Sequence, residues 1–454
     1  MAANTKIMTE GKPLKLIISF ALPLMIGNVF QQLYTVVDTM VVGQVLGVHA
    51  LAALGASDWM NWMMLSIIQG FSQGFSILMA QEFGAGNHKR LKKVVGNAAG
   101  LSVISAVILF IAGEIMVFPV LNLLRTPDAI IHQSLLYLRI MFAGIPVVMV
   151  YNLLASILRA LGDGRTPLYA MITAAVINIV LDILFVMGFH WGIAGAAAAT
   201  LIAQFSSGLY CYFYIRKVEI LSLDRDDFCL EKELDVKLIF LGLPMALQNA
   251  IISIGGMIVQ TVVNGFGVIF IAGFTATNKL YGVLEVAATS YGYAMITYVG
   301  QNLGAGKIER IKKGMKAALC VAVLTAAVIG TCMLFFGHGI LGCFISGEPQ
   351  EAEMTMEIAY HYLFIMSVCL PILYILHVIR SALQGMGDTL LPMLSGIAEF
   401  MMRTGTAAVL PFLIGEEGIF YAEILAWTGA DIILVISYFV RMGKLNRRFK
   451  PENR

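Results

Sequence analysis

Acidic and amide side chains inside apolar segments are the residues of this sequence most suited to chemistry. Asp38 follows a short polar run that includes Tyr34. Asn178 and Asp182 are four residues apart, so a helix would present both on one face. Carboxylate and amide oxygens are hard ligands that suit sodium, and burial beside a like charge also favours a protonated carboxyl. These residues predict a site for a small cation, either a proton or sodium.

The composition indicates a protein that lives in a lipid bilayer. Of 454 residues, 59% are apolar and 13% are charged, whereas a soluble chain has roughly 25% charged residues. A net charge of +2 argues against a nucleic-acid partner, which calls for a strong basic excess. None of the six cysteines lies in a CxxC pair, so we expect no zinc site, no disulfide framework and no cofactor.

Apolar runs long enough to cross a bilayer recur along the whole chain. They predict an all-α membrane protein with twelve transmembrane helices near residues 16–40, 51–80, 94–118, 135–158, 168–189, 193–215, 238–264, 271–299, 315–336, 358–383, 391–414 and 418–440.

The basic residues predict the orientation of these spans. If both termini are cytoplasmic, all but four of the 30 Lys and Arg residues lie in cytoplasmic segments, and Arg380 is counted among these. The exceptions are Arg125, Arg139, Lys279 and Arg403. Because cytoplasmic loops are rich in Lys and Arg, we expect a multi-pass protein of the plasma membrane with both termini inside the cell.

The two halves of the chain repeat one pattern. The pairs are Leu22-Pro23 with Leu243-Pro244, Gly84-Ala85-Gly86 with Gly304-Ala305-Gly306, Pro146 with Pro371, and Gly162-Asp163 with Gly387-Asp388, all 220 to 225 residues apart. The repeat predicts two six-helix bundles, 1–215 and 238–440, related by a pseudo-two-fold axis along the membrane normal. A charged linker, 216–237, would join them, and 441–454 would form a cytoplasmic tail. Prolines inside the spans predict kinks.

The sequence resembles the multidrug and toxic compound extrusion (MATE) transporter family over nearly its whole length, within the superfamily that also holds oligosaccharidyl-lipid and polysaccharide flippases. The resemblance rests on Leu22-Pro23 with Asp38, on Gln81–Gly86 and its repeat Gln301–Gly306, and on the segment Arg159–Pro167. It implies an antiporter that exports organic compounds, often cationic and amphipathic, against an inward flow of protons or sodium. Alternating access of two bundles would drive this exchange.

The resemblance also implies which residues couple the ion. The matching positions are Asp38, Asn152, Asn178, Asp182 and Thr200, and sodium would bind at Asp38, Asn178 and Asp182. Another branch of the family places an acidic residue in the seventh span. Residues 238–264 contain no Asp or Glu, so a cation site of that form is not expected here.

Polar residues in other spans are candidates for contact with the substrate. Glu399 and Arg403 are four residues apart and predict a neutralised pair on one helix face, whereas Glu285 would attract a cation. The candidates for the substrate cavity are Tyr34, Met63, Gln69, Gln73, Glu285 and Arg403. We expect small organic molecules as substrates and a monomeric protein.

Three other functions fit parts of the sequence. A lipid-linked saccharide flippase shares the plan of two bundles. Such a protein would be expected to carry more Lys and Arg residues within its spans than this sequence does. A membrane-embedded prenyl transferase needs grouped aspartates for magnesium and diphosphate, and only one such pair is present. A channel is the third alternative. No P-loop or zinc-protease motif occurs, so we expect a transporter and not an enzyme.

Overall fold

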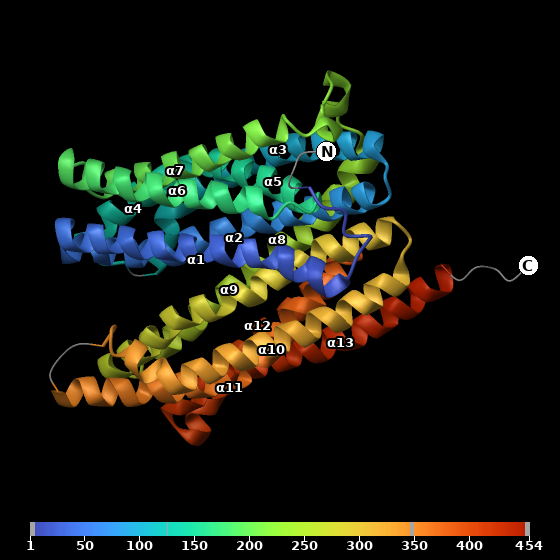
Figure 1. Ribbon diagram of the computed structural model, residues 1–454. Helices are drawn as coiled ribbons and strands as arrows, with labels where there is room; N and C mark the ends of the chain where they lie inside the picture. Colours follow the sequence, from blue (N-terminus) through green and yellow to red (C-terminus); the bar gives the residue numbers. More distant parts are fainter. Residues whose placement is uncertain (1–4, 125, 346–348, 450–454) are drawn as a thin grey trace, which may run out of the picture. The chain divides into compact units, whose positions relative to one another are not determined.

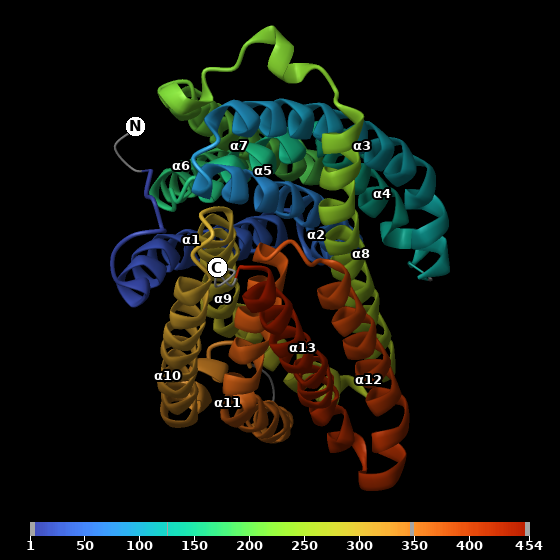
Figure 2. The same cartoon turned by 90° about the vertical axis from the view of Figure 1, so that its right-hand side faces the viewer.

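A computed structural model describes residues 5–124, 126–345 and 349–449 (Figures 1 and 2). This part of the chain is almost entirely helical and contains no strand. The α-helices are α1 Pro13–Leu46, α2 Val48–Gly84, α3 His88–Leu123, α4 Asp128–Ala143, α5 Ile145–Ala160, α6 Arg165–Asp182, α7 Gly192–Ile215, α8 Lys232–Val263, α9 Val268–Gly304, α10 Ile308–Leu341, α11 Pro349–Gly385, α12 Leu390–Ile414 and α13 Tyr421–Arg448. A π-helix, η1, covers Ile183–Gly188, and three 3₁₀-helices cover Glu219–Leu221 (η2), Arg225–Phe228 (η3) and Glu416–Phe420 (η4).

Many of these helices can cross a membrane. In the described residues ten helices are long and apolar enough, and the bent pair α4 and α5 makes an eleventh. The structure also has a helix, α9, at the predicted span 271–299. Lys279 and Glu285 lie in the first half of α9, and α9 is not among these ten helices. The predicted number of twelve is therefore not confirmed.

Proline shapes the fourth predicted span. Its two helices, α4 and α5, meet at Gly144 with a bend of 48°. Pro146 stands in the first turn of α5, where a missing N–H costs little because that group has no partner in the helix. The kink predicted for Pro146 is confirmed. Pro23, Pro244 and Pro371 lie inside the continuous helices α1, α8 and α11.

The contacts divide the chain into two compact units, and each is described by itself. Unit 1 comprises residues 1–8 and 22–250, and unit 2 comprises residues 9–21 and 251–454. The division falls inside α1 and α8, so each of these helices contributes to both units. The domain boundaries expected from the sequence stay a prediction.

Unit 1 is held together by a buried apolar core and by close glycine contacts. Its core joins apolar side chains of α2 to α5 and α7, including Phe142 and Ile68. The first half of α8 packs tightly on α2, because Gly70 faces the backbone of Ala246 and Gly74 faces that of Gly242. Without side chains at these glycines the two backbones approach closely, which buries the central part of α2.

Unit 2 contains a stack of aromatic rings. The Tyr362 ring lies 4.8 Å from the Phe274 ring and 4.9 Å from the Phe420 ring, centroid to centroid. Phe270 stacks on Phe420 at 5.6 Å. The stack joins α9, α11 and η4, and large apolar area buried in this way stabilises the unit.

The segment between α7 and α8 is docked on α3. The side chain of Asn97 donates to the carbonyl oxygen of Cys229 at 3.2 Å and accepts from the N–H of Glu231 at 2.7 Å. Lys93 forms an ion pair with Glu231. Gly96 faces the carbonyl group of Asp227 so closely that any side chain there would overlap it. This segment is therefore an ordered part of unit 1.

The backbone repeats between the halves as the sequence motifs predict. Gly86 and Gly306 have φ of 71° and 68°, and Gly162 and Gly387 have φ of 78° and 81°. In both halves an aspartate then caps the next helix. Asp163 accepts from the N–H of Thr166 at 2.9 Å. Asp388 accepts from the N–H of Leu391 at 3.3 Å. Each turn needs a glycine because φ is positive there.

The contact at Gly96 generates a prediction about stability. Gly96→Ala forces a methyl group into the carbonyl of Asp227, and such overpacking costs about 1–3 kcal/mol. Gly405→Ala on α12 is the control, because no other atom lies within 4 Å of the added methyl; it should stabilise by about 0.5–1 kcal/mol. Thermal unfolding of the purified protein measures both variants. Equal midpoints for the two would contradict the docking of this segment on α3.

Candidate functional site

The two predicted acids meet in unit 1. Asp38 lies on α1 and Asp182 is the last residue of α6. Their carboxyl groups are close enough to interact electrostatically. Asp182 has no exposed surface, and Asp38 is half-buried. Two negative charges so close together disfavour one another, so this pair can bind a proton or another small cation.

Several oxygens at this site have no hydrogen-bond donor. Among the described residues these are Oδ1 of Asp38, Oδ1 of Asn178, both carboxyl oxygens of Asp182 and Oε1 of Gln204, all shielded from solvent. A buried acceptor without a partner costs about 1–3 kcal/mol, and more when it is charged. These oxygens therefore form a set that a cation or protons would satisfy.

Side chains of α7 complete the surroundings of the acids. Asn178 donates its amide N–H to the hydroxyl of Thr200 at 3.4 Å, which leaves its carbonyl oxygen available. The Tyr34 hydroxyl interacts with the side chain of Gln204, which lies one turn beyond Thr200 on α7. The same hydroxyl is close enough to Asp38 for an electrostatic interaction. Five of the residues named in the sequence analysis, Tyr34, Asp38, Asn178, Asp182 and Thr200, are thus gathered in one place.

In the part of the chain that the structure describes, no hydrogen bond joins the other predicted residues of the first half to the two acids. Asn152 on α5 donates to the carbonyl oxygen of Val148 in its own helix at 2.9 Å. Met63, Gln69 and Gln73 are half-buried on α2. Their part in a substrate cavity, like the coupling role of Asn152, stays a prediction.

Two residues near the acids were not predicted. Asp58 on α2 is close enough to Asp38 for its negative charge to destabilise the charged form of the Asp38 carboxyl group. Tyr137 on α4 is buried and lies within electrostatic range of Asp38, Asp58 and Asp182. The presence of Asp58 inside a predicted span was a usable signal, because every ionisable residue in a span calls for a partner or a function.

The backbone changes form directly after Asp182. The π-helix η1 begins at Ile183 and ends at Gly188. Such wider turns are rare and are frequent at functional sites. Asn178 and Asp182 both lie in the regular helix before this change.

Unit 2 carries a different arrangement of charges. Glu399 is 4% exposed and lies between two arginines, with Oε2 at 2.6 Å from Arg380 Nη2 and Oε1 at 2.9 Å from Arg403 Nη2. Arg403 also pairs with Glu423 at 2.7 Å. His377 Nε2 lies 3.4 Å from Glu285 Oε1 at the more exposed end of this network. The predicted pair of Glu399 and Arg403 is confirmed.

The structure corrects the placement of Arg380. Its assignment to a cytoplasmic connection is wrong, because Arg380 lies inside α11 and is 8% exposed. The carboxylate of Glu399 compensates the buried positive charge of Arg380, since a buried charge requires a hydrogen-bonded partner. Asp431 on α13 is close enough to Arg380 and Glu399 to interact with both.

Known proteins are similar to this chain in sequence and in fold. The MatE family model matches residues 23–184 and 244–408. The chain belongs to the MatE family. The two matched segments include Asp38 and Asp182 in the first half and Glu399 and Arg403 in the second.

Relatives of this MatE-family chain include two proteins of Bacillus subtilis. The probable multidrug resistance protein YoeA is 32% identical over 76% of this chain and 75% of its own length. The probable multidrug resistance protein YpnP is 31% identical over 90% of this chain and 91% of its own length. A MATE structure in complex with MaL6 has a TM-score of 0.90 at 21% identity, covering 98% of this chain and 100% of that one. This likeness shows that the chain has the all-helical fold of that MATE structure.

The buried network in unit 2 generates a prediction about stability. Glu399→Gln leaves Arg380 and Arg403 without the carboxylate between them, and breaking a buried ion pair in this way costs about 3–5 kcal/mol. Denaturant unfolding of the purified protein, compared with the wild type, measures this loss.

The matched control is Glu114→Gln. Glu114 is 29% exposed and lies 3.7 Å from Arg139, and such a pair contributes about 0–1 kcal/mol. If the two variants lost the same stability, the network around Glu399 would not be the buried scaffold described here.

Proposed function

We propose that this MatE-family protein is a secondary active antiporter that exports organic compounds, often cationic and amphipathic. An inward flow of protons or sodium, bound at Asp38 and Asp182, would drive export by alternating access of two six-helix bundles. The single observation that carries this proposal is the meeting of these two acids in a buried site. The names of the two Bacillus relatives support organic compounds as the substrates.

The charges around the acids support an exchangeable cation. No Lys or Arg is among the described groups that interact with Asp38 or Asp182. Two buried carboxylates without a basic partner are costly in a membrane. A proton or sodium ion therefore stabilises the pair while it is bound. Its release to the cytoplasm would leave the pair ready for another ion from outside.

The same proposal includes the topology. We propose twelve spans. These are the ten apolar helices, the bent pair α4 and α5 as one span, and α9. The long helix of 37 residues and the match of α9 to α2 in the repeat support this count. The predominance of Lys and Arg in the connections supports cytoplasmic termini. Residues 450–454 of the expected tail lie outside the described residues.

The charges of unit 2 weigh against the flippase alternative. A diphosphate-linked lipid needs positive charge that is free to bind it. Arg380 and Arg403 lie within helices, and both are paired with Glu399. Their charge is therefore already compensated by the protein itself.

Substitution of the acids tests the coupling site. Asp38→Asn and Asp182→Asn each keep the size of the side chain but remove a group that binds a cation. We expect efflux of a fluorescent organic cation from cells or vesicles to fall at least tenfold in each variant. Expression and thermal stability are measured in parallel, so that loss of folding is recognised.

The control for this test is Glu353→Gln, because Glu353 is an exposed acid on α11. Efflux in this variant should stay within twofold of the wild type. Undiminished efflux in Asp38→Asn and Asp182→Asn would remove the acid pair from the mechanism.

Imposed ion gradients test the antiport itself. Proteoliposomes are loaded with dye and given either a pH gradient or a sodium gradient. We expect one of the two to drive dye movement against its own gradient, and the Asp182→Asn protein to respond to neither. Dye movement that only follows its own gradient, with no saturation, would identify a channel.

A further inference from the structure

Within the described residues, Glu285 on α9 has a histidine and no arginine as its ion-pair partner. The two buried arginines of the network form their ion pairs with Glu399 and Glu423. Oε1 of Glu285 lies 3.4 Å from Nε2 of His377 on α11. Neutral imidazole carries no charge, so this pairing compensates the negative charge of Glu285 only while a proton is bound at the pair.

The other ring nitrogen of His377 determines where that proton lies. Nδ1 lies 3.0 Å from the carbonyl oxygen of Leu373, one turn earlier in α11. A carbonyl oxygen only accepts, so the hydrogen is assigned to Nδ1, which donates it. In neutral imidazole Nε2 then has no hydrogen, and its lone pair faces a carboxylate oxygen of Glu285. These two acceptors need one proton between them, held either by the imidazole or by the carboxyl group.

Water can reach the Glu285–His377 pair. The side chains of Glu285 and His377 are 32% and 17% exposed, whereas that of Glu399 is 4% exposed. In the proposed topology Glu285 lies within a span, where contact of a carboxyl group with lipid is costly. Its exposed surface therefore faces water, and the proton at the pair can exchange with solvent.

The network around the pair has more acids than arginines. Its other titratable side chains come from four helices: Tyr281 and Tyr291 of α9, Tyr374 and Arg380 of α11, Glu399 and Arg403 of α12, and Glu423 and Asp431 of α13. Two further helices contribute neutral groups, the carbonyl of Ile252 on α8 to Arg403 and the hydroxyl of Thr325 on α10 to Tyr291. Two arginines thus lie among four carboxyl groups in the described part of unit 2. An added positive charge is therefore favourable here.

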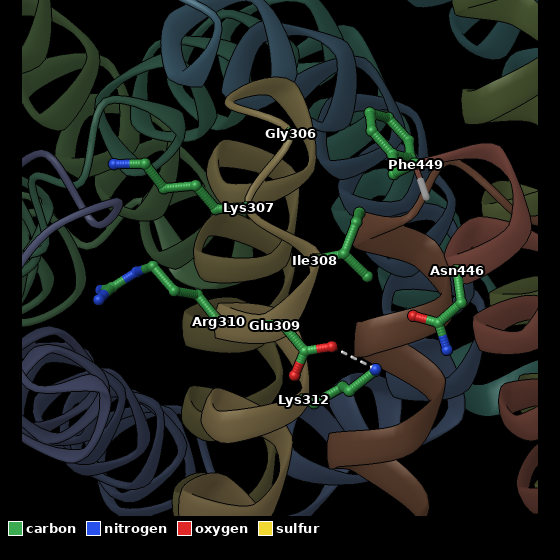
Figure 3. Close-up of a pocket in the computed structure, with 8 residues that line it drawn as sticks. All are labelled: Gly306, Lys307, Ile308, Glu309, Arg310, Lys312, Asn446 and Phe449. Atoms are coloured by element: carbon green, nitrogen blue, oxygen red, sulfur yellow. Dashed lines mark hydrogen bonds and ion pairs between the residues drawn. The ribbon is translucent and has the colours of Figure 1, made fainter. Parts of the chain in front are cut away.

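The basic side chains at the start of α10 do not supply this charge. They line a cavity between α10 and α13, where Figure 3 shows Lys312 pointing at Glu309. Arg310 donates to the amide oxygen of Asn302 at 3.0 Å. Glu285 lies about 28 Å before the end of α9, at 1.5 Å per residue, and α10 begins after that end. These cations are engaged by near neighbours and are remote from the pair.

An aromatic ring lies one turn from Glu285. Tyr281 precedes Glu285 by four residues in α9, so both lie on one face of the helix. The Tyr281 ring stacks on Trp427 of α13, with 5.9 Å between centroids and 17° between planes. Trp427 is fully buried, whereas Tyr281 keeps part of its surface exposed. Aromatic rings attract organic cations, so a ring beside a carboxylate suits a cation with apolar substituents.

We propose that Glu285 and His377 form a second cation site, which exchanges one proton for the positively charged group of an organic substrate. As the cation arrives, the N–H or O–H bond of the shared proton breaks, and the proton passes to water. The carboxylate then holds the cation by charge alone, so the pair and its ligand have the same net charge in both states. The inference rests on the proposed export of organic cations and adds the point at which a proton displaces the substrate.

Binding of tetraphenylphosphonium to the purified full-length protein tests this exchange. This cation neither gains nor loses a proton, so any proton released on binding comes from the protein. Calorimetry in sodium-free buffers of different ionisation enthalpy, from about pH 5.5 to about pH 8.5, covers the range in which histidine titrates. The wild type should release up to about one proton for each bound cation, and its affinity should rise by up to about tenfold for each pH unit.

Two substitutions separate the parts of the pair. Glu285→Gln removes the carboxylate, so affinity at the highest pH should fall by at least about tenfold and the proton release should disappear. His377→Gln keeps the carboxylate and gives it an amide donor that holds no exchangeable proton. This variant should still bind the cation but release less than about half a proton, in line with the linkage of the two ligands. A misfolded protein could not show that second result.

The matched control is His361→Gln, on the same helix. His361 Nδ1 lies 3.1 Å from Glu417 Oε1, and both side chains are well exposed. Because an exposed pair contributes little, affinity and proton release in this variant should stay within about twofold of the wild type. Equal effects of His361→Gln and His377→Gln would overturn the site.

Three other results would also overturn the inference. These are a wild type that does not bind tetraphenylphosphonium, binding without proton release at every pH, and proton release that persists in Glu285→Gln but disappears in Asp38→Asn/Asp182→Asn. The last result would assign the exchange to unit 1. Because the titrations use no gradient, a failure of ion-driven efflux in vesicles would contradict the antiport and leave these measurements unchanged.

Discussion

The central constraint on this structure is the compensation of negative charge inside a bundle of apolar helices. A carboxylate in such surroundings needs a proton, a metal ion or a basic side chain. Glu399 in unit 2 receives two arginines from the chain itself. Asp38 and Asp182 in unit 1 lie beside one another, and no such base is among the described groups that interact with them. The first arrangement is complete within the protein, whereas the second, in the proposed mechanism, is completed by a cation from outside.

The two halves therefore use one scaffold for two purposes. The same turn glycines and the same capping aspartates recur in both, so the backbone plan is shared. At the site, however, Arg403 stands where the first half has Asn178, at an offset of 225. A guanidinium at that position neutralises nearby acids permanently. An amide carries no such charge, and in the proposed mechanism an exchangeable cation takes this part.

The positions of the helices and of the bend in the fourth span could be predicted from the sequence, because they depend on patterns of neighbouring residues. Apolar runs located the helices, and Pro146 located the bend in the fourth span. Arg380 was misplaced because counting basic residues in loops cannot recognise an arginine that is buried by a glutamate on another helix. Asp58 was missed for a related reason, since its proximity to Asp38 depends on how α1 packs near α2. Contacts between distant segments have no signature within either segment.

Infrared spectroscopy of the carboxyl groups tests the central claim most directly. The account predicts a protonated carboxyl band in the purified protein that is lost at high pH or on addition of sodium. This band should be absent from the Asp38→Asn/Asp182→Asn variant and retained in Glu353→Gln. A wild-type spectrum that shows no protonated carboxyl from this pair, together with no measurable binding of sodium, would contradict the account.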